Sequence, residues 1–169
     1  MTEKSAKKNI LENKIEPEIS KKDIDKLIRN HVIGSMGVGL IPFPWLDFLG
    51  LTGVQINLVR KLANIYDIPF FQDKVKNLIS SLVGSALPSS IGTPFASLVK
   101  TIPLAGQSLG IITMPILSGA STYALGKVFV RHFAAGGTFL TLDPDKVKDY
   151  YAEMFKEGKL LSVNVKKND

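Results

Sequence analysis

Two long apolar runs dominate the pattern of hydrophobic and polar positions along this chain. Residues 32–59 contain one charged side chain, Asp47, and residues 77–126 also contain one, Lys100. Basic residues border both runs: Arg60, Lys61, Lys127 and Arg131. This pattern is typical of helices that meet a bilayer, or that pack closely against each other, with their charged ends on one side.

The N-terminal half of the chain predicts three helices. Ser20 and Asp23 form a capping box that opens the first helix, and the two prolines within residues 41–45 must end it. Apolar spacing predicts a second helix over 47–66, which an Ile-Pro pair ends, and a third helix over 72–86. The third helix has one apolar face, opposite a face of serine and glycine.

Residues 101–133 form the most lipid-compatible stretch of the chain. Their uncharged part, 101–126, is long enough to cross a hydrocarbon core with some tilt, and Pro115 should kink it. Small residues at a spacing of four permit close helix contact there: Gly106 with Gly110, and Ala120 with Ala124. Because the stretch is rich in Gly, Ser and Thr, its hydrophobicity is weak, and the tightly packed core of a soluble hairpin stays an alternative.

The C-terminal region returns to the pattern of soluble proteins. Asp143 and Pro144 form a cap with proline in the first turn, and an amphipathic helix follows. Gly158 after a glutamate predicts the end of this helix. Apolar residues then alternate over 161–165, which predicts a short terminal strand or an extended arm.

A weak internal repeat organises these elements. Ile41-Pro42 and Ile102-Pro103 each precede an apolar helix with a basic end. The sequence therefore predicts an all-α bundle of helical hairpins, with Gly/Pro-rich apolar helices and a C-terminal amphipathic helix. Such hairpins are able to dip into a membrane without crossing it. The predicted organisation is a flexible polar leader (1–19), a single helical domain (20–159) and a C-terminal tail (160–169).

Composition and charge narrow the function classes. The chain has a net charge of +6 and no cysteine, which excludes disulfides, thiol catalysis and zinc–thiolate sites. The positive excess lies at the borders of the apolar runs, which suits an anionic membrane surface better than nucleic acid. Residues 1–25 contain no apolar core of signal-peptide length, so we expect the protein to stay in the compartment where it is made.

Motifs that would indicate catalysis or cofactor binding are absent from the sequence. Val128 follows Gly126 and Lys127, and Ser121 stands where a P-loop needs its first glycine, so no P-loop is present. His31 and His132 have no ligand spacing, and we expect them to be solvated or interfacial. The sequence thus predicts a non-enzymatic protein without metal or cofactor.

The proline-rich tip is the remaining candidate site. Phe43 and Trp45 are either an interfacial anchor, together with Pro42 and Pro44, or the base of a soluble core. Asp47 is either a functional carboxylate within an apolar run or a helix cap, and the upstream prolines favour the cap. We take the tip and the four bordering basic residues as candidate contacts with a membrane or partner.

Several blocks carry a family resemblance. They are IPFPWLD at 41–47, NLVRKL at 57–62, ASTYALG at 120–126 and DPDK at 143–146. These blocks resemble the domain of unknown function 697 family, which is related to YcjF-type proteins. The resemblance covers residues 26–159. It implies a helical, membrane-associated module that often occurs fused to an Era- or dynamin-like GTPase domain. Without a P-loop, this chain resembles a standalone copy, and no catalytic residue carries over.

The functional prediction is a non-enzymatic, membrane-associated helical module that serves as a membrane adaptor for a separate Era/dynamin-like GTPase. Its expected location is the cytoplasmic side of a bacterial inner membrane. Its expected partners are membrane lipids, a GTPase and further copies of itself, but not nucleic acid. Two alternatives stay open: a soluble helical protein–protein interaction domain, and a small pore or transporter component in which Asp47 is functional.

Overall fold

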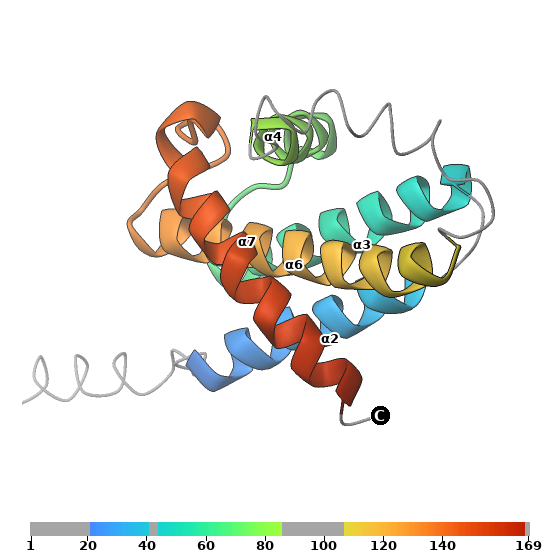
Figure 1. Cartoon of the computed structure of the whole chain (residues 1–169). Coiled ribbons are helices and arrows are strands. Elements are labelled where there is room, and N and C mark those ends of the chain that lie inside the picture. The colour runs from blue at the N-terminus through green and yellow to red at the C-terminus, as the bar shows by residue number, and fades with distance from the viewer. Residues whose placement is uncertain (1–20, 41–43, 86–106, 168–169) are drawn as a thin grey trace, which may run out of the picture.

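The computed structural model describes residues 21–40, 44–85 and 107–167. Every regular element within these ranges is a helix, which confirms the predicted all-α class. The helices are α2 (Lys21–Val38), α3 (Pro44–Ile65), α4 (Gln72–Ser85), α6 (Gln107–Ala134) and α7 (Pro144–Lys167). Figure 1 shows α6 along the middle of the bundle, with α7 crossing it obliquely.

Local sequence explains where these helices begin and end. A proline occupies the first position of both α3 and α7, where a helix has no use for a backbone N–H. Asp143 caps α7 as predicted, because its Oδ1 accepts a hydrogen bond from the backbone N of Asp145 at 3.1 Å. After α3, Asp67 adopts a left-handed φ of 57°, and after α6 the φ of Gly136 is 80°. Both conformations stop a helix from continuing.

The neighbours of α6 run in defined directions. Lys127 Nζ and Asp25 Oδ1 form an ion pair of 2.9 Å that joins the last third of α6 to the start of α2, so these helices are antiparallel. Tyr66 follows the end of α3 and contacts Phe133 near the end of α6, with ring centroids 5.9 Å apart. The helices α3 and α6 are therefore parallel. α7 runs antiparallel to α6, and α4 lies against α3 and α7.

These directions give the bundle two different ends. The charged end is formed by the helix termini at Lys21, Ile65, Ala134 and Pro144. The apolar end is formed by the helix termini at Val38, Pro44 and Gln107. With 22 residues, α3 extends from one end to the other over about 33 Å.

Aromatic rings fill the core at the charged end. Phe129, Phe133 and Phe139 contact one another, with ring centroids 5.2 to 5.9 Å apart. Tyr66 and Phe70, from the segment after α3, contact this group. Phe129 and Phe139 are completely or almost completely buried. Because each such ring removes about 150–250 Å² from water, this cluster is the main hydrophobic anchor of the charged end.

Small residues bring the helices together further along the bundle. A Cβ placed on Gly158 of α7 would lie 2.9 Å from the Cα of Ala120 on α6. A Cβ placed on Gly119 would lie 2.8 Å from the Cγ of Met36 on α2. The backbones of α6 and α7 are therefore nearly in contact, as small residues allow, whereas α2 reaches Gly119 through the side chain of Met36. The predicted pair of Ala120 and Ala124 contains the point where α7 crosses, and both residues are fully buried.

Two predictions for the C-terminal region are wrong. α7 does not stop at Gly158 but continues to Lys167, because this glycine is a helix-crossing contact rather than a terminus. The residues 161–165 are helical and form no strand or extended arm. Their alternation of apolar side chains does not decide the structure, because Ser162, which lies between two of them, is the side chain fully buried against α6. The described part of the predicted tail is thus the end of α7.

The first half of the predicted repeat agrees with the structure, since α2 and α3 pack as an antiparallel pair. Residues 41–43, where the first turn was predicted, lie outside the described residues. In the second half, α4 has little contact with α6 and instead lies against α3 and α7. The main neighbours of α6 are α2 and α7. Residues 86–106, which include the second predicted turn, also lie outside the described residues.

Candidate functional site

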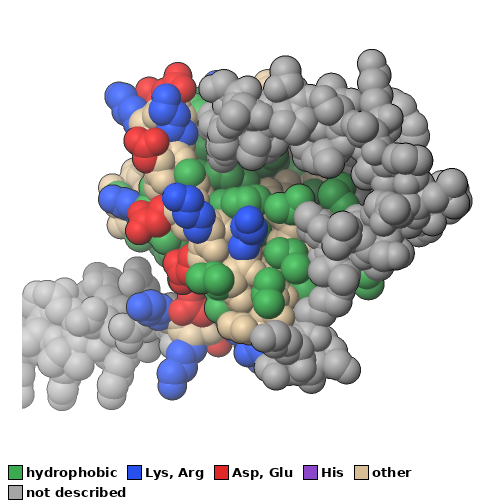
Figure 2. Space-filling model, in the orientation of Figure 1, with side chains coloured by type: hydrophobic (Ala, Val, Ile, Leu, Met, Phe, Trp, Pro, Cys, Tyr) green, Lys and Arg blue, Asp and Glu red, His purple; other side chains and the backbone are tan. Residues whose placement is uncertain are grey.

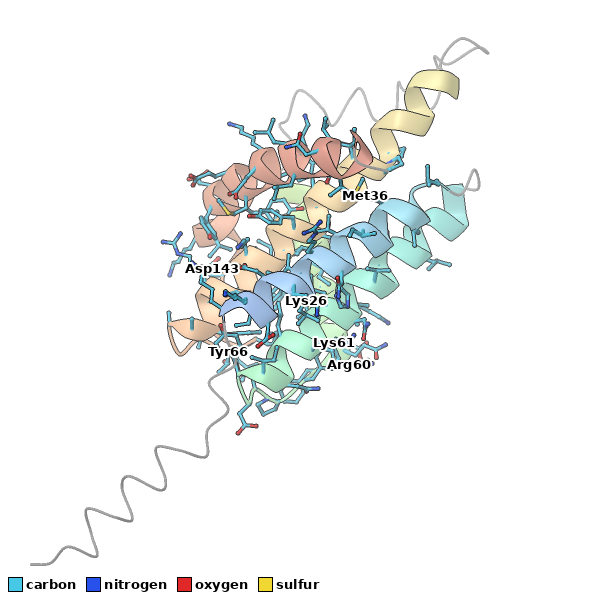
Figure 3. The ribbon with its side chains drawn as sticks, turned by 90° about the horizontal axis from the view of Figure 1, so that it is seen from below. Lys26, Met36, Arg60, Lys61, Tyr66 and Asp143 are labelled. Carbon is cyan, nitrogen blue, oxygen red and sulfur yellow. The ribbon has the colours of Figure 1, made fainter. Side chains whose placement is uncertain are left out.

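The four basic residues that border the apolar runs belong to the charged half of the bundle. Arg60 and Lys61 lie in the last two turns of α3, and Lys127 and Arg131 lie in the last two turns of α6. Because α3 and α6 are parallel, the structure brings the two pairs to the same half. Figure 3 labels Lys26, Arg60 and Lys61 in this half of the bundle and Met36 in the other.

Three of these four cations are held against aromatic rings. The guanidinium carbon of Arg60 lies 4.8 Å from the centroid of Phe70, and Arg60 also donates a hydrogen bond to Gln72 Oε1 at 3.3 Å. The guanidinium carbon of Arg131 lies 4.4 Å from the centroid of Tyr150. Lys127 Nζ lies 5.4 Å from the Tyr123 centroid, in addition to its ion pair on α2. Such contacts fix the position of a cation while leaving its charge accessible.

Exposed apolar side chains gather toward the opposite end. Leu40 follows the end of α2, Leu49 lies in the second turn of α3, and their side chains are 58% and 68% exposed. Other exposed apolar side chains of this half are Ile33 of α2, Met114 of α6, and Leu160, Leu161 and Val163 of α7, whereas Phe71 and Leu140 are exposed at the charged end. In Figure 2 the blue and red side chains lie mainly on the left, and green surface extends to the right. A cluster of exposed apolar side chains at one end is typical of a binding surface.

The predicted tip belongs to this apolar end. Pro44, Trp45 and Asp47 lie in the first turn of α3, but their side chains are outside the described part of the structure. Pro42 and Phe43 are outside it altogether. Since α3 begins at Pro44, it starts three residues earlier than predicted, and Asp47 lies inside its first turn. The choice between a capping and a functional role for Asp47 stays a prediction.

None of the helices in the described ranges combines the length and apolarity that crossing a bilayer requires. For the described part of α6, the predicted membrane-compatible stretch, the reason is visible in its sequence. Gly, Ser and Thr recur along it, and its last two turns carry Lys127 and Arg131. Many of its small residues face other helices rather than the surface, since Ser118, Gly119, Ser121 and Thr122 are all buried.

A buried polar chain connects three helices, and the sequence reading missed it. Gln55 of α3 donates from Nε2 to Ser121 Oγ at 3.1 Å, and this hydroxyl also bonds the Tyr151 hydroxyl of α7 at 3.0 Å. Burial raises the pKa of Tyr151 to about 12, although the hydrogen bond with Ser121 works in the opposite direction. Thr122 Oγ1, on the residue after Ser121, and Ser162 Oγ of α7 are also buried, and neither has a hydrogen-bond partner among the described residues. In the sequence, the signal for this chain of bonds is Gln55, a polar amide within the mostly apolar run 32–59.

The histidines have structural roles. His31 is only 8% exposed, so the expectation of a solvated or interfacial side chain is wrong for it. Its Nδ1 lies 2.8 Å from the carbonyl oxygen of Leu27, and its Nε2 lies 3.3 Å from Asn57 Nδ2. His132 is half-buried, with Nε2 2.9 Å from the carbonyl oxygen of Thr138. The described residues contain no group of three or more His, Asp or Glu side chains that would hold a metal ion.

These features define a small α-helical bundle with one charged end and one apolar end. The chain belongs to the family described as "Domain of unknown function (DUF697)", which it matches over residues 4–159. The resemblance seen in the sequence is thereby confirmed. No solved structure matches the chain.

Two relatives place the chain among named proteins. It is 33% identical over 143 residues to Magnetosome membrane protein 22 of Magnetospirillum gryphiswaldense, a match that covers 84% of this chain and 73% of that protein. It is also 34% identical over 96 residues to the glycerophosphocholine phosphodiesterase GPCPD1 of Homo sapiens. That second match covers 57% of this chain but only 13% of the phosphodiesterase.

Proposed function

We propose that the protein is a non-enzymatic, membrane-associated helical module whose apolar end enters one leaflet of a bilayer. The observation that carries this proposal is the uneven distribution of exposed apolar side chains: of the nine large ones among the described residues, seven lie in the apolar half. Leu40 and Leu49 are exposed at the end where α2 turns into α3, whereas the basic residues lie toward the other end. Insertion from one side needs no spanning helix, and it would remove these side chains from water. A relative that is named as a membrane protein supports the proposal.

The finer part of the proposal is that the module recruits a separate Era/dynamin-like GTPase to the cytoplasmic side of a bacterial inner membrane. Two points support it. The family resemblance implies frequent fusion to an Era- or dynamin-like GTPase domain, and this sequence contains no P-loop of its own. The charged end gives such a partner a surface that stays in water when the apolar end is in lipid. Co-purification of a tagged chain with a P-loop GTPase from its own cells tests this part.

A soluble helical interaction domain is the second candidate function. One observation favours it: the aromatic core at the charged end is closed, since Phe129 and Phe139 are buried. Under this alternative, the exposed leucines bind another protein. Sedimentation with vesicles separates the two candidates, because only the first predicts binding to lipid alone.

The test uses two matched double variants. Leu40→Glu/Leu49→Glu changes the apolar end, at side chains that are 58% and 68% exposed. Phe71→Glu/Leu140→Glu adds the same charge at the charged end, at side chains that are 53% and 73% exposed. Since full burial of a leucine stabilises by about 1.5–3 kcal/mol, the loss of two mostly exposed ones removes about 2–4 kcal/mol of membrane binding. This corresponds to a roughly 30- to 1,000-fold weaker partition.

Co-sedimentation with neutral and with anionic vesicles, each at low and high salt, measures the effect. We expect binding of the unaltered chain to survive high salt, because apolar insertion is not screened. We expect Leu40→Glu/Leu49→Glu to lose this binding and Phe71→Glu/Leu140→Glu to keep it. Equal loss in both variants, or no vesicle binding of the unaltered chain, would sink the membrane proposal and favour the soluble domain.

A further inference from the structure

The charged end contains a pocket of about 220 Å³ between the last turns of α6 and the first turns of α7. Arg131 and Lys146 contribute the charges of its lining, and Val128, Val147 and Tyr150 contribute apolar surface. Gly39, next to Leu40, lies against Pro115 of α6. Arg131 is 16 residues further along this helix, so its Cα lies about 24 Å from the level of Leu40.

This position decides which partners are able to reach the pocket, provided that the proposed insertion of the apolar end holds. At physiological salt, charges are screened over about 8 Å, so a separation of about 24 Å is about three screening lengths. Lipid headgroups at the inserted end are therefore too far away to attract Arg131 or Lys146. The pocket faces a partner in water.

The chemistry of the pocket favours a carboxylate. The ring of Tyr150 holds the guanidinium of Arg131 at 4.4 Å, and no carboxylate of the described residues forms an ion pair with it. The Lys146 side chain is 82% exposed and has only a loose contact of 3.8 Å with Asp143. A planar guanidinium in a fixed position matches a carboxylate with two parallel hydrogen bonds. The apolar lining suits an uncharged side chain next to that carboxylate.

A purely structural role explains only part of this arrangement. A cation in the last turn of α6 complements the helix dipole and covers the Tyr150 ring. That role does not require Lys146, which comes from a different helix and lines the same pocket. A nucleic-acid backbone fits less well, because it presents a row of phosphates, whereas Arg131 and Lys146 are the two lysine or arginine side chains that line this pocket.

We propose that this pocket is a docking point for an acidic segment of a partner protein. A carboxylate of the segment binds between Arg131 and Lys146, and a neighbouring apolar side chain packs on Val128 and Val147. The proposal rests on the proposed function for the orientation of the protein. It does not depend on the identity of the partner as a GTPase.

The test measures binding of a short fluorescent peptide of alternating glutamate and leucine, by anisotropy, with the glutamine–leucine peptide as the neutral probe. Arg131→Gln/Lys146→Gln removes both cations of the pocket. Lys74→Gln/Lys76→Gln removes two exposed lysines of α4, which do not line it, and so controls for net charge. We expect the first variant to weaken binding of the acidic peptide about tenfold or more and the second about twofold or less. Arg131→Lys, which keeps the charge without the planar fork, should fall between them.

Three results would overturn the inference: no binding of the acidic peptide to the unaltered chain, equal binding of the neutral peptide, or equal losses in the two double variants. Far-UV circular dichroism of each variant establishes that its helices are retained. Vesicle sedimentation separates this inference from the proposed function. We expect Arg131→Gln/Lys146→Gln to bind vesicles normally, and a loss of vesicle binding would show instead that the charged end contacts lipid. If the unaltered chain binds the peptide but no vesicles, the pocket stands and the membrane proposal fails.

Discussion

The crossing of α6 and α7 makes a prediction in which two identical substitutions have different effects. Gly158 and Gly53 both lie inside helices, so alanine at either position improves helix propensity by about 1 kcal/mol. A Cβ on Gly53 meets no atom within 4 Å, so Gly53→Ala should stabilise the protein by about 0.5–1 kcal/mol. A Cβ on Gly158 lies 2.9 Å from the Cα and 3.0 Å from the carbonyl oxygen of Ala120. Both are backbone atoms, so α6 and α7 must move apart.

Because the propensity gain is common to both variants, their difference isolates the cost of overpacking. We expect Gly158→Ala to be less stable than Gly53→Ala by about 1–3 kcal/mol. For a chain of this length the difference amounts to about 2–12 °C in Tm. Urea and thermal unfolding of the purified variants, followed by far-UV circular dichroism, measures it, provided that the denaturant slopes agree. If Gly158→Ala is as stable as Gly53→Ala, then α7 does not cross α6 at Ala120, and the continuation of α7 past this glycine loses its physical basis.

Two further predictions concern the buried polar chain. Ser121→Ala leaves the buried amide of Gln55 and the hydroxyl of Tyr151 without their shared partner, so it should lower the free energy of unfolding in urea by about 1–3 kcal/mol. The control Ser81→Ala, on an exposed face of α4, should change it by less than about 0.5 kcal/mol. Burial raises the pKa of Tyr151 in the folded state to about 12, from an ordinary value of 10.0, so the unfolded state releases this proton first as the pH rises. The contribution of Tyr151 to the free energy of unfolding is therefore fully present below pH 10 and is lost between about pH 10 and 12. Tyr151→Phe should reduce that fall, and an unchanged pH profile in this variant would show that the hydroxyl is not buried.

Much of the helix pattern could be predicted because its signals are local. The apolar spacing of α4 placed this helix at 72–86, and the structure has it at Gln72–Ser85. Asp143 and Pro144 marked the start of α7, because a cap and a first-turn proline act within one helical turn. The basic residues that border the apolar runs could also be identified from the sequence, although the contacts of Arg60 and Arg131 with aromatic rings could not.

The failures arose where a distant residue decides the structure. A glycine after a glutamate is typical of a helix end. Gly158 instead lies inside α7 because it packs against Ala120, which is far away in the sequence. In the same way, nothing next to His31 in the sequence indicates that Asn57 comes close to it from another helix. The placement of the charged helix ends on one side was predicted, and the parallel direction of α3 and α6 agrees with it.

The ion pair between Asp25 and Lys127 links positions 102 apart, and this separation bears on how the protein is made. α2 leaves the ribosome early, but its main partner, α6, is still unsynthesised at that time. At about 5–20 residues per second, roughly 5–20 s pass before Lys127 is added to the chain. During this interval the faces of α2 and α3 that later meet α6 have no native cover. We therefore expect the nascent chain to need a chaperone or a nearby lipid surface well before the bundle closes.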